Sequence, residues 1–245
     1  MRSDPSWNPG SARPQLDAQG VDVWRVDLEV TDERLDRLRR HLCEEERARA
    51  GRFHFDRDRR AFTAARGSLR EILARYLEFE PGAVAFSYGP RGKPELAGDH
   101  RSAPVHFNLS HAAGLALVAV GREGGIGVDI ERVDRSVDHR SIAERFFSPT
   151  EIEALPTAEP ELARAFFTCW TRKEAFIKAL GEGLAVPLDS FDVMRPGDLS
   201  PLLETRLHAE VAAGWSLRDL DPDPAYAAAL VAPKRMQWLR CWQFG

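Results

Sequence analysis

The sequence predicts an α+β fold made of two similar halves that divide near Arg122. Short runs with apolar residues at every second position are typical of β-strands, and such runs occur on both sides of this boundary. Two longer runs with apolar residues every three or four positions are typical of amphipathic helices. The segment VDLE at 26–29 precedes a helix as VDIE at 128–131 does, which indicates an internal duplication.

In the first half, the alternating segment VDVWRVDLEV (21–30) predicts a strand. Thr31 is a suitable N-cap for a helix that follows, because the next segment carries leucines at helical spacing. A long amphipathic helix is expected over 56–77, a turn over SYGPRGKPEL (87–96), and two strands in VHFNLSH and GLALVAVG.

In the second half, GIGVDIERV (125–133) predicts a strand that follows the flexible segment GREGG. Ser148 and Glu151 match a capping box, with a proline between them at the first helical position. A second long helix is expected from Glu161 to Leu180. Gly181 directly follows it, as a C-cap should. The remaining residues, with AYAAALVA and a Trp-rich end, predict strands and turns.

Composition narrows the class of protein. A chain of 245 residues can form a substantial core, and a net charge of −4 gives no broad face for nucleic acid. No segment approaches the roughly 18 apolar residues of a membrane span, and residues 1–20 lack the apolar core of a signal peptide. Three widely spaced cysteines without metal-ligand spacing indicate a reduced, cytoplasmic setting. We therefore expect a cytoplasmic protein that contacts neither nucleic acid nor membrane.

Two acids stand on the strand 125–133. Because side chains alternate along a strand, Asp129 and Glu131 share one face with Gly127. Two carboxylates about 7 Å apart on one face repel each other unless water or a cation lies between them. A solvent-facing edge would explain the pair, and so would a metal site.

The second long helix adds a third acid and a lysine one turn apart. At ~100° per residue, Glu174 lies beside Trp170 at the rim of the apolar stripe, and Lys178 follows on the same side. An ordinary i,i+4 pair explains them without function. However, the chain has only four lysines among 34 basic residues, and this helix carries Lys173 and Lys178. A carboxylate at the rim of an apolar stripe also needs a partner.

Together these residues suggest a specific chemistry. Three carboxylates with a nearby lysine suit Mg²⁺ bound to a polyphosphate, because Mg²⁺ takes one or two protein carboxylates together with phosphate oxygens. The chain has no GxxxxGK[ST] segment, so a P-loop does not hold these phosphates.

Other polar residues allow two interpretations each. Ser110 and His111 lie at a predicted strand end, where a lone His is commonly structural; no GxSxG surrounds the serine, so a serine hydrolase is poorly supported. The segment RGKP is either a turn or a loop that binds phosphate through Arg91 and Lys93. ERARAGRF is either a solvated face or an anion-binding one; its basic residues are Arg47, Arg49 and Arg52.

Several motifs in a fixed order resemble a known family. GVDIERV, FFSPTEIEAL and WTRKEAFIKALGEGL follow one another as they do in the 4′-phosphopantetheinyl transferases, with GKP, FNLSH and VPLDSF in the expected places. The resemblance covers roughly residues 35 to 195 and is strongest to the large surfactin-synthetase-activating type. Each piece alone is a weak signal, whereas the ordered set is specific.

The resemblance implies a fold and a reaction. It implies two halves related by pseudo-twofold symmetry, each a small, mainly antiparallel sheet packed on a long helix, with the active site between them. We divide the chain into a tail (1–20), a coenzyme A-binding half (21–122) and a metal-binding, catalytic half (123–245). The implied enzyme is a monomer that transfers phosphopantetheine from coenzyme A to a serine of an apo acyl or peptidyl carrier protein. The transfer depends on Mg²⁺ and releases adenosine 3′,5′-bisphosphate.

The resemblance also implies roles for single residues. Asp129, Glu131 and Glu174 would face Mg²⁺, with Glu174 also the first choice for the base that takes the hydroxyl proton. A family position that is often basic and faces the 3′-phosphate of the coenzyme falls at Glu46, so Arg47 or Arg49 would have to replace it. The remaining coenzyme contacts would come from Lys178, which touches the pyrophosphate or assists proton transfer, and from Arg91, Lys93, Ser110 and His111.

Two alternatives remain open at this point. A different Mg²⁺-dependent enzyme that acts on a nucleotide polyphosphate would keep the metal site and change the acceptor. A non-catalytic module that binds carrier proteins would be favoured if an acidic ligand were missing, but all three acids are present.

Overall fold

The computed structural model describes residues 6–89, 92–181, 186–201, 203–205 and 212–245. The chain divides into two compact units between Arg122 and Glu123. Among the described residues, the first unit takes those of 6–122 together with Leu239–Gly245, and the second takes those between Glu123 and Trp238. Each unit is described by itself below.

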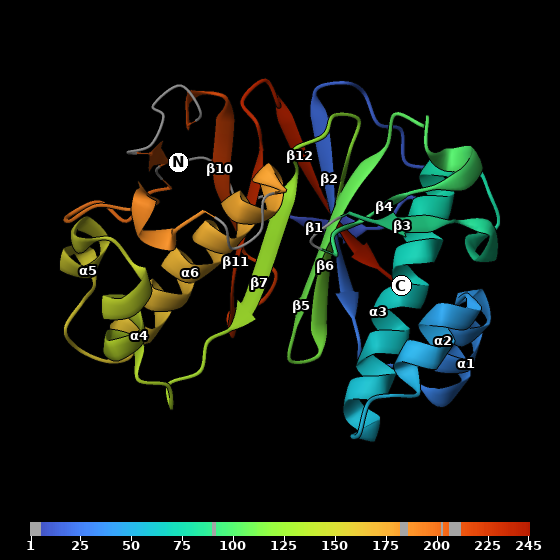
Figure 1. Ribbon diagram of the computed structural model, residues 1–245, viewed down its shortest axis with the longest axis horizontal. Helices are drawn as coiled ribbons and strands as arrows, with labels where there is room; N and C mark the ends of the chain where they lie inside the picture. The colour runs from blue at the N-terminus through green and yellow to red at the C-terminus, as the bar shows by residue number, and fades with distance from the viewer. Residues whose placement is uncertain (1–5, 90–91, 182–185, 202, 206–211) are drawn as a thin grey trace. The chain divides into compact units, whose positions relative to one another are not determined.

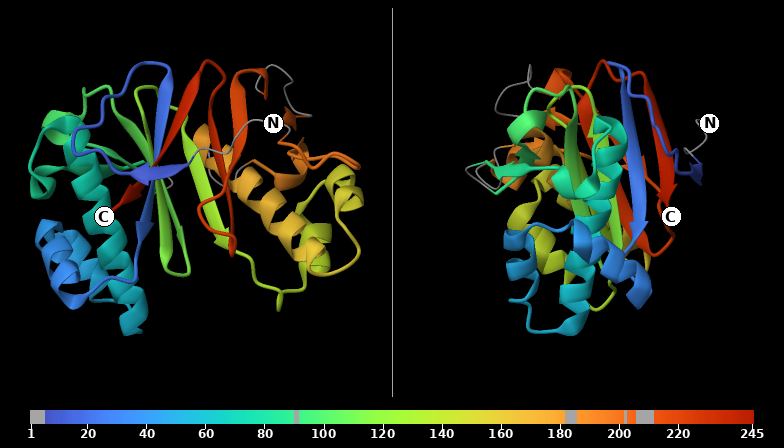
Figure 2. Two further views of the ribbon diagram at one scale, coloured as in Figure 1. Left: turned by 180° about the vertical axis from the view of Figure 1, so that it is seen from behind. Right: turned by 90° about the vertical axis from the view of Figure 1, so that its right-hand side faces the viewer.

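The first unit is a sheet with one long helix across a face and two shorter helices beside it (Figures 1 and 2). Along the chain, a two-stranded ribbon follows the long helix and precedes the next two strands of the sheet. Its elements are β1 (Trp7–Pro9), β2 (Gly20–Asp27), α1 (Asp32–His41), α2 (Glu44–Ala50), α3 (Asp56–Leu77), η1 (Pro81–Ala83), β3 (Phe86–Tyr88), β4 (Pro94–Leu96), η2 (Gly98–His100), β5 (His106–Ala112), β6 (Leu115–Gly121) and β12 (Trp238–Phe244).

The sheet of the first unit has the strand order β1-β12-β2-β6-β5. Strand β6 pairs antiparallel with β2 and β5, and β1 pairs parallel with β12. Trp24, Val26 and Leu28 lie in the core between this sheet and α3, which contributes Leu69 and Leu73. The apolar alternation along β2 therefore fixes which face of the sheet the helix covers.

The two ends of the chain differ from the predicted boundaries. Residues Trp7–Pro9, within the predicted tail, form β1 against β12. Residues 239–245, assigned from sequence to the second half, complete the sheet of the first unit instead. The reason is specific contact: β12 lies beside β2 in the sheet, and Arg240 donates from Nε to Oδ1 of the fully buried Asp22 on β2 at 2.7 Å.

The second unit repeats the plan with one sheet, one long helix and two shorter helices (Figure 1). Its sheet has the strand order β10-β11-β7 and is antiparallel throughout. Its elements are β7 (Gly127–Arg132), α4 (His139–Phe146), α5 (Pro149–Ala154), α6 (Glu161–Leu180), η4 (Leu188–Ser190), β8 (Phe191–Asp192), β9 (Glu204–Thr205), β10 (Trp215–Leu220) and β11 (Tyr226–Pro233).

The order of elements confirms the predicted α+β fold with two similar halves. Each unit runs strand, two short helices, long helix, two-stranded ribbon and two further strands. The three strands that the units share also have the same order in space, β2-β6-β5 in one and β7-β11-β10 in the other. Each unit is thus a small, mainly antiparallel sheet packed on a long helix, as expected.

The predicted helix ends are confirmed. The Thr31 hydroxyl accepts from the backbone N–H of Arg34, and Ser148 with Glu151 forms the capping box of α5. Gly181 ends α6 with a φ of 75°, a left-handed conformation that glycine adopts without strain. None of the helices in the described residues is both long enough and apolar enough to cross a membrane.

Candidate active site

The acidic face of β7 points toward α6. A Cβ atom added to Gly127 would lie 2.0 Å from the Ala175 carbonyl oxygen and 2.5 Å from the Ala179 nitrogen, so the helix backbone rests directly on this glycine. Asp129 and Glu131 follow on the same face by strand alternation. Asp129 is 3% exposed and Glu131 is half-buried, which excludes the solvent-facing edge as the explanation for the pair.

The neighbouring strand leaves room beside these acids. In the antiparallel register, Asp129 pairs with Ala229 and Glu131 with Ala227, so two small side chains of β11 share the face. Both alanines are buried. The carboxylates therefore lie in a partly dry environment with little bulk around them, between the sheet and α6.

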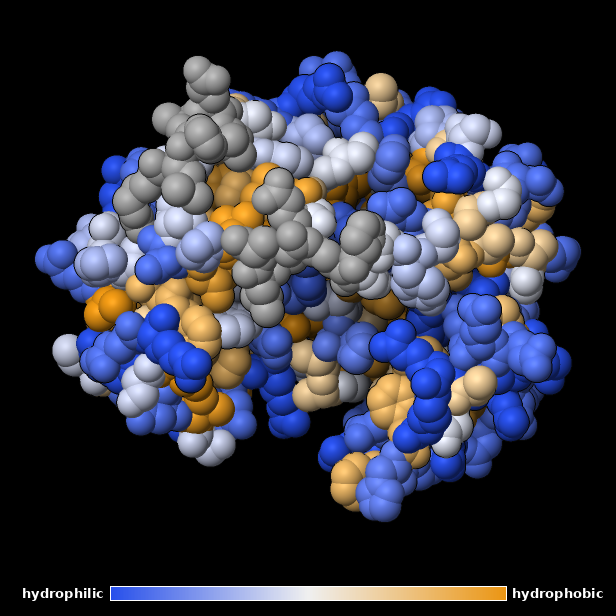
Figure 3. Space-filling view, viewed as in Figure 1, coloured by the Kyte–Doolittle hydropathy of each residue, from blue (hydrophilic) through white to orange (hydrophobic). Residues whose placement is uncertain are grey.

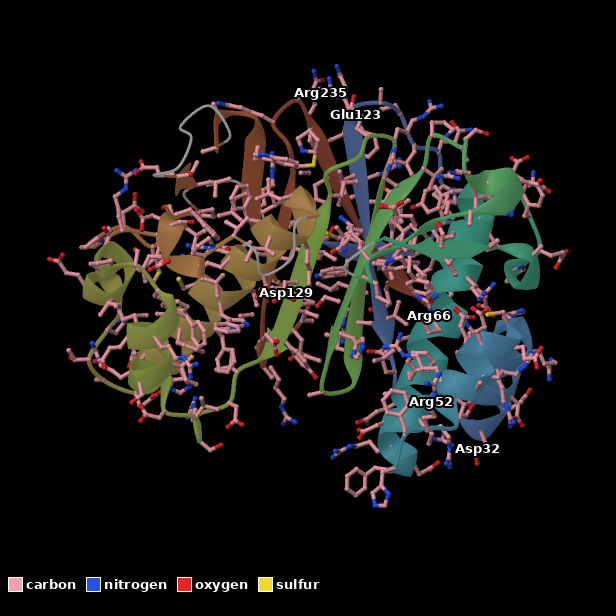
Figure 4. All side chains as sticks on the ribbon, in the orientation of Figure 1. Asp32, Arg52, Arg66, Glu123, Asp129 and Arg235 are labelled. Carbon is pink, nitrogen blue, oxygen red and sulfur yellow. The ribbon has the colours of Figure 1, made fainter. Side chains whose placement is uncertain are left out.

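Lys178 of α6 contacts the strand directly. Its Nζ lies 2.6 Å from Oδ1 of Asp129 and 3.4 Å from the carbonyl oxygen of Val128. Figure 4 labels Asp129 on β7, in the part of the unit where α6 passes over the strand. The lysine thus links helix and strand, a contact that an ordinary i,i+4 pair on one helix does not provide.

With three carboxylates and one ammonium, this cluster has an excess of negative charge. Burial raises the pKa of Glu131 to about 7, with repulsion from Asp129 and Glu174 adding to it and Lys178 opposing it. Burial and repulsion from Asp129 likewise raise the pKa of Glu174, against the attraction of Lys178. The arrangement therefore favours additional positive charge at this place.

The chemistry of these donors fits a hard divalent cation, because Mg²⁺ prefers carboxylate oxygens. In the ranges that the structure describes, no group of three or more acidic, His or Cys side chains converges as ligands of a single ion. The acidic donors and the excess of negative charge are thus suited to a cation. The described side chains do not by themselves form a complete coordination shell.

Lys173, the neighbour of Glu174, has a different place. Its Nζ lies 2.7 Å from Oε2 of Glu151 and donates to the carbonyl oxygens of Leu188 and Phe191 at 2.6 and 2.8 Å. Lysine and glutamate are both almost completely buried. Lys173 therefore joins α6 to α5 and to the start of β8, which is a structural role.

The remaining predicted residues belong to the first unit. On β5, Ser110 is buried opposite Leu117 and His111 is exposed opposite Ala116. Lys93 directly precedes β4 and is half-buried, whereas Arg91 lies outside the described residues. Thus the structure brings Asp129, Glu131, Glu174 and Lys178 together, and it describes Lys93, Ser110 and His111 separately.

The basic residues of α2 are on the surface. Arg47 donates from Nη1 to the Leu42 carbonyl oxygen at 2.5 Å, and the Arg49 guanidinium lies 5.3 Å from the centre of the Phe62 ring. Both are exposed, and Figure 3 shows mostly hydrophilic residues over α1 and α2. Glu46, in contrast, is 3% exposed and turned inward.

One residue of the site was not assigned a role from the sequence. Gly127 determines how closely α6 approaches β7, and hence whether Lys178 reaches Asp129. The available signal was a glycine inside a strand pattern, which commonly marks a close backbone approach.

The chain matches known proteins over both units. A model of the 4′-phosphopantetheinyl transferase superfamily matches residues 125–231, and one described as the N-terminal part of a 4′-phosphopantetheinyl transferase matches residues 28–123. The chain is 40% identical over 226 residues to the 4′-phosphopantetheinyl transferase HetI from Nostoc sp., with 92% of each chain covered.

Two more distant relatives agree. Sfp, a 4′-phosphopantetheinyl transferase of Bacillus subtilis, is 28% identical over 208 residues, covering 84% of this chain and 89% of Sfp. The human L-aminoadipate-semialdehyde dehydrogenase-phosphopantetheinyl transferase is 29% identical over 214 residues, covering 80% of this chain and 68% of the relative. The chain belongs to the 4′-phosphopantetheinyl transferase superfamily and is a phosphopantetheine-transferring enzyme.

Proposed function

We propose that this enzyme transfers the 4′-phosphopantetheine group of coenzyme A to a serine of an apo carrier protein, with Mg²⁺. The serine oxygen forms a bond to the phosphorus next to pantetheine, and the bond from that phosphorus to the bridging pyrophosphate oxygen breaks. Adenosine 3′,5′-bisphosphate leaves with the electron pair of that bond. The observation that carries the proposal is the cluster of Asp129, Glu131, Glu174 and Lys178 in a chain of this family.

The three acids of the cluster are the residues that would hold the metal. The raised pKa values of Glu131 and Glu174 and the burial of Asp129 favour a cation over further negative charge. Bound there, Mg²⁺ would offset the charge that develops on the phosphoryl oxygens and the leaving group.

Glu174 and Lys178 have roles of their own. A carboxyl with a raised pKa is a better proton acceptor than an ordinary glutamate, which supports Glu174 as the base for the serine proton. The Lys178 ammonium, held by Asp129 at 2.6 Å, is a fixed positive charge suited to pyrophosphate oxygens.

The coenzyme contacts of the first unit are assigned on the resemblance and on exposure. His111 is exposed at a strand end, and Lys93 lies in a tight turn. Arg47 and Arg49 are exposed cations and remain the candidates for the 3′-phosphate. The buried Glu46 cannot contact a ligand in that position, which supports the shift of this role to its neighbours.

Finer features extend this proposal. Ser110 and Arg91 are further coenzyme contacts, by the resemblance alone. We assign the chain to the large surfactin-synthetase-activating type because it carries two units. An assignment to a type represented by HetI fits the comparisons equally well. One chain with both units would act as a monomer. A cytoplasmic location agrees with three free cysteines.

The direct test is product analysis. The full chain is incubated with coenzyme A, MgCl₂ and several apo acyl and peptidyl carrier proteins, and each carrier is measured by intact mass. We expect the mass of at least one carrier to rise by one phosphopantetheine group, and the same carrier with its acceptor serine changed to alanine to stay unmodified. Nucleotide cleavage without modification of any carrier would contradict the proposal and favour a different nucleotide-polyphosphate enzyme.

A further inference from the structure

Glu46 is the centre of a buried charge cluster in the first unit. Its Oε1 accepts from Nε and Nη2 of Arg66 at 2.8 and 2.6 Å, and its Oε2 accepts from Nε of Arg70 at 2.8 Å. Burial alone would raise the pKa of Glu46, but the two guanidinium groups outweigh it and hold the pKa below its usual value. The carboxylate therefore fixes both arginines of α3 against α2.

Both arginines also reach the ribbon formed by β3 and β4. The guanidinium carbons of Arg66 and Arg70 lie 4.6 and 5.0 Å from the centre of the Phe86 ring. Arg70 donates to the carbonyl oxygen of Val84 at 2.5 Å, just before the ribbon begins. Two residues beyond Phe86 on β3, Nη2 of Arg66 donates to the Tyr88 hydroxyl at 3.1 Å. Figure 4 labels Arg66 on α3.

The ribbon ends in the turn that carries Lys93. Tyr88 pairs with Pro94, and beyond this pair the Gly89 N–H donates to the Lys93 carbonyl oxygen at 3.0 Å. Gly92 closes the turn with an N–H to the Gly89 carbonyl oxygen at 2.9 Å and has a φ of 78°. A shift at Tyr88 therefore passes directly to the backbone of Lys93.

Tyr88 is 48% exposed, so its ring buries little apolar surface. The hydrogen bond that its hydroxyl accepts from the nearly buried Arg66 guanidinium is then a principal contact between this end of the ribbon and α3. Such a bond determines position more than it determines stability, because the same buried cluster keeps its other contacts without it.

We propose that Arg66 and Tyr88 are positioning residues for coenzyme A: the Glu46–Arg66–Tyr88 chain of contacts sets the place of the ribbon and, through it, of Lys93. This inference rests on the proposed contact of Lys93 with the coenzyme phosphates. It gives the buried Glu46 a function in coenzyme binding that acts through the protein rather than by contact.

The test compares Tyr88→Phe with Ser87→Ala in the full-length enzyme. Ser87 is exposed and lies on the opposite face of the same strand, so it is a matched control. Loss of one hydrogen bond should raise the Kd for coenzyme A, measured by calorimetry, roughly fivefold in Tyr88→Phe. The Tm and the kcat at saturating coenzyme A should stay near wild type, and Ser87→Ala should match wild type throughout.

A double-mutant cycle with Lys93→Ala shows whether the effect passes through Lys93. We expect Lys93→Ala to weaken coenzyme A binding and Tyr88→Phe to add nothing in that background. Additive losses, or an unchanged Kd in Tyr88→Phe, would overturn the positioning role while the Lys93 contact stands. An unchanged Kd in Lys93→Ala would overturn both, and carrier modification by that variant would show that the proposed reaction itself survives.

Discussion

The two units share one plan and differ on the strand face that their long helix covers. Their long helices end at Leu77 and Leu180, which are 103 residues apart. At the same separation, Val26 of β2 corresponds to Asp129 of β7, each on the side of its long helix. Apolar core in one unit is thus an acidic cluster in the other.

This difference shows that the acidic cluster is an addition to the fold and not a requirement of it. Burial of Val26 and Leu28 stabilises the first unit by about 1.5–3 kcal/mol for each side chain. At the corresponding positions, the second unit buries Asp129 and partly buries Glu131, whose pKa of about 7 reports the unfavourable surroundings of its charge. The second unit gives up stability here, as is typical of functional sites.

The comparison also corrects the alignment suggested by the letters. VDLE and VDIE place Asp27 opposite Asp129, but a shift of one residue in a strand moves a side chain to the other face. Asp27 points away from the α3 side, with 57% of its side chain exposed. The order of elements supports a duplication. The VDLE and VDIE segments, however, are shifted by one residue relative to the structural correspondence.

Among the variants considered, Asp129→Ala should reduce activity most. We expect carrier modification to fall about 10³-fold, because the carboxylate proposed to face the metal is also the partner of Lys178, and both roles are lost together. The matched control is Asp27→Ala, at the position that only the letters equate with it, and it should retain wild-type activity. Near-normal transfer by an Asp129→Ala variant that is folded, as judged by circular dichroism, would show that this acid is not part of the active site.

Gly127→Ala tests the close approach of α6 to β7. A methyl group 2.0 Å from a backbone oxygen forces strand and helix apart, so we expect a loss of about 3 kcal/mol or more in the free energy of unfolding. Gly51 is a control, since a Cβ there meets atoms only at 3.6 Å and its φ is −65°. Urea unfolding of both variants measures this, and equal stability of the two would contradict the packing described here.

Glu174→Gln separates the roles of ligand and base. We expect the rate at saturating Mg²⁺ to fall about 10²-fold with coenzyme A binding nearly intact, because a glutamine cannot accept the serine proton. Glu71→Gln is the matched control: Glu71 has the corresponding place on α3 and pairs with Arg34 and His41, at 2.7 and 3.0 Å. Its activity should stay normal. Full recovery of Glu174→Gln in excess Mg²⁺ would rule out the base.

The smallest effect concerns the acid stability of the first unit. The folded pKa of Glu46 lies below its unfolded value, so this carboxylate stabilises the protein above pH ~4.5, and the contribution is lost as pH falls through the folded pKa. Unfolding measured from pH 6 down to pH 3 should therefore show a shallower loss of stability in Glu46→Gln than in wild type. Parallel curves for the two proteins would show that the Arg66 and Arg70 contacts do not perturb Glu46.

Much of the fold could be predicted from local sequence. The two long helices match their predicted ranges because strong apolar stripes and end signals agree there. The short helix α2 was not predicted, since its sequence EEERARA lacks an apolar stripe. The strand pairing of β1 and β12 was also missed, because it joins residues more than 200 positions apart.

The site could be predicted in part. The shared face of Asp129 and Glu131 follows from strand periodicity alone. The different environments of Lys173 and Lys178 do not follow from it. Both lie on α6, but Lys173 forms a buried ion pair with Glu151 whereas Lys178 contacts Asp129 of β7. The inward turn of Glu46 likewise depends on Arg66 and Arg70, some twenty residues away, which no local pattern indicates.

The proposed metal site lies on the acidic face of β7, and Asp27 of β2, which only the repeated letters equate with Asp129, has no part in it. The most direct measurement is calorimetric titration of Mn²⁺, as a stand-in for Mg²⁺, into the full chain with coenzyme A present, for wild type, Asp129→Asn and Asp27→Asn. We expect one ion to bind per chain in wild type and Asp27→Asn, and binding at least tenfold weaker in Asp129→Asn because one ligand charge is removed. Equal affinity in Asp129→Asn and wild type, with both proteins folded, would contradict it.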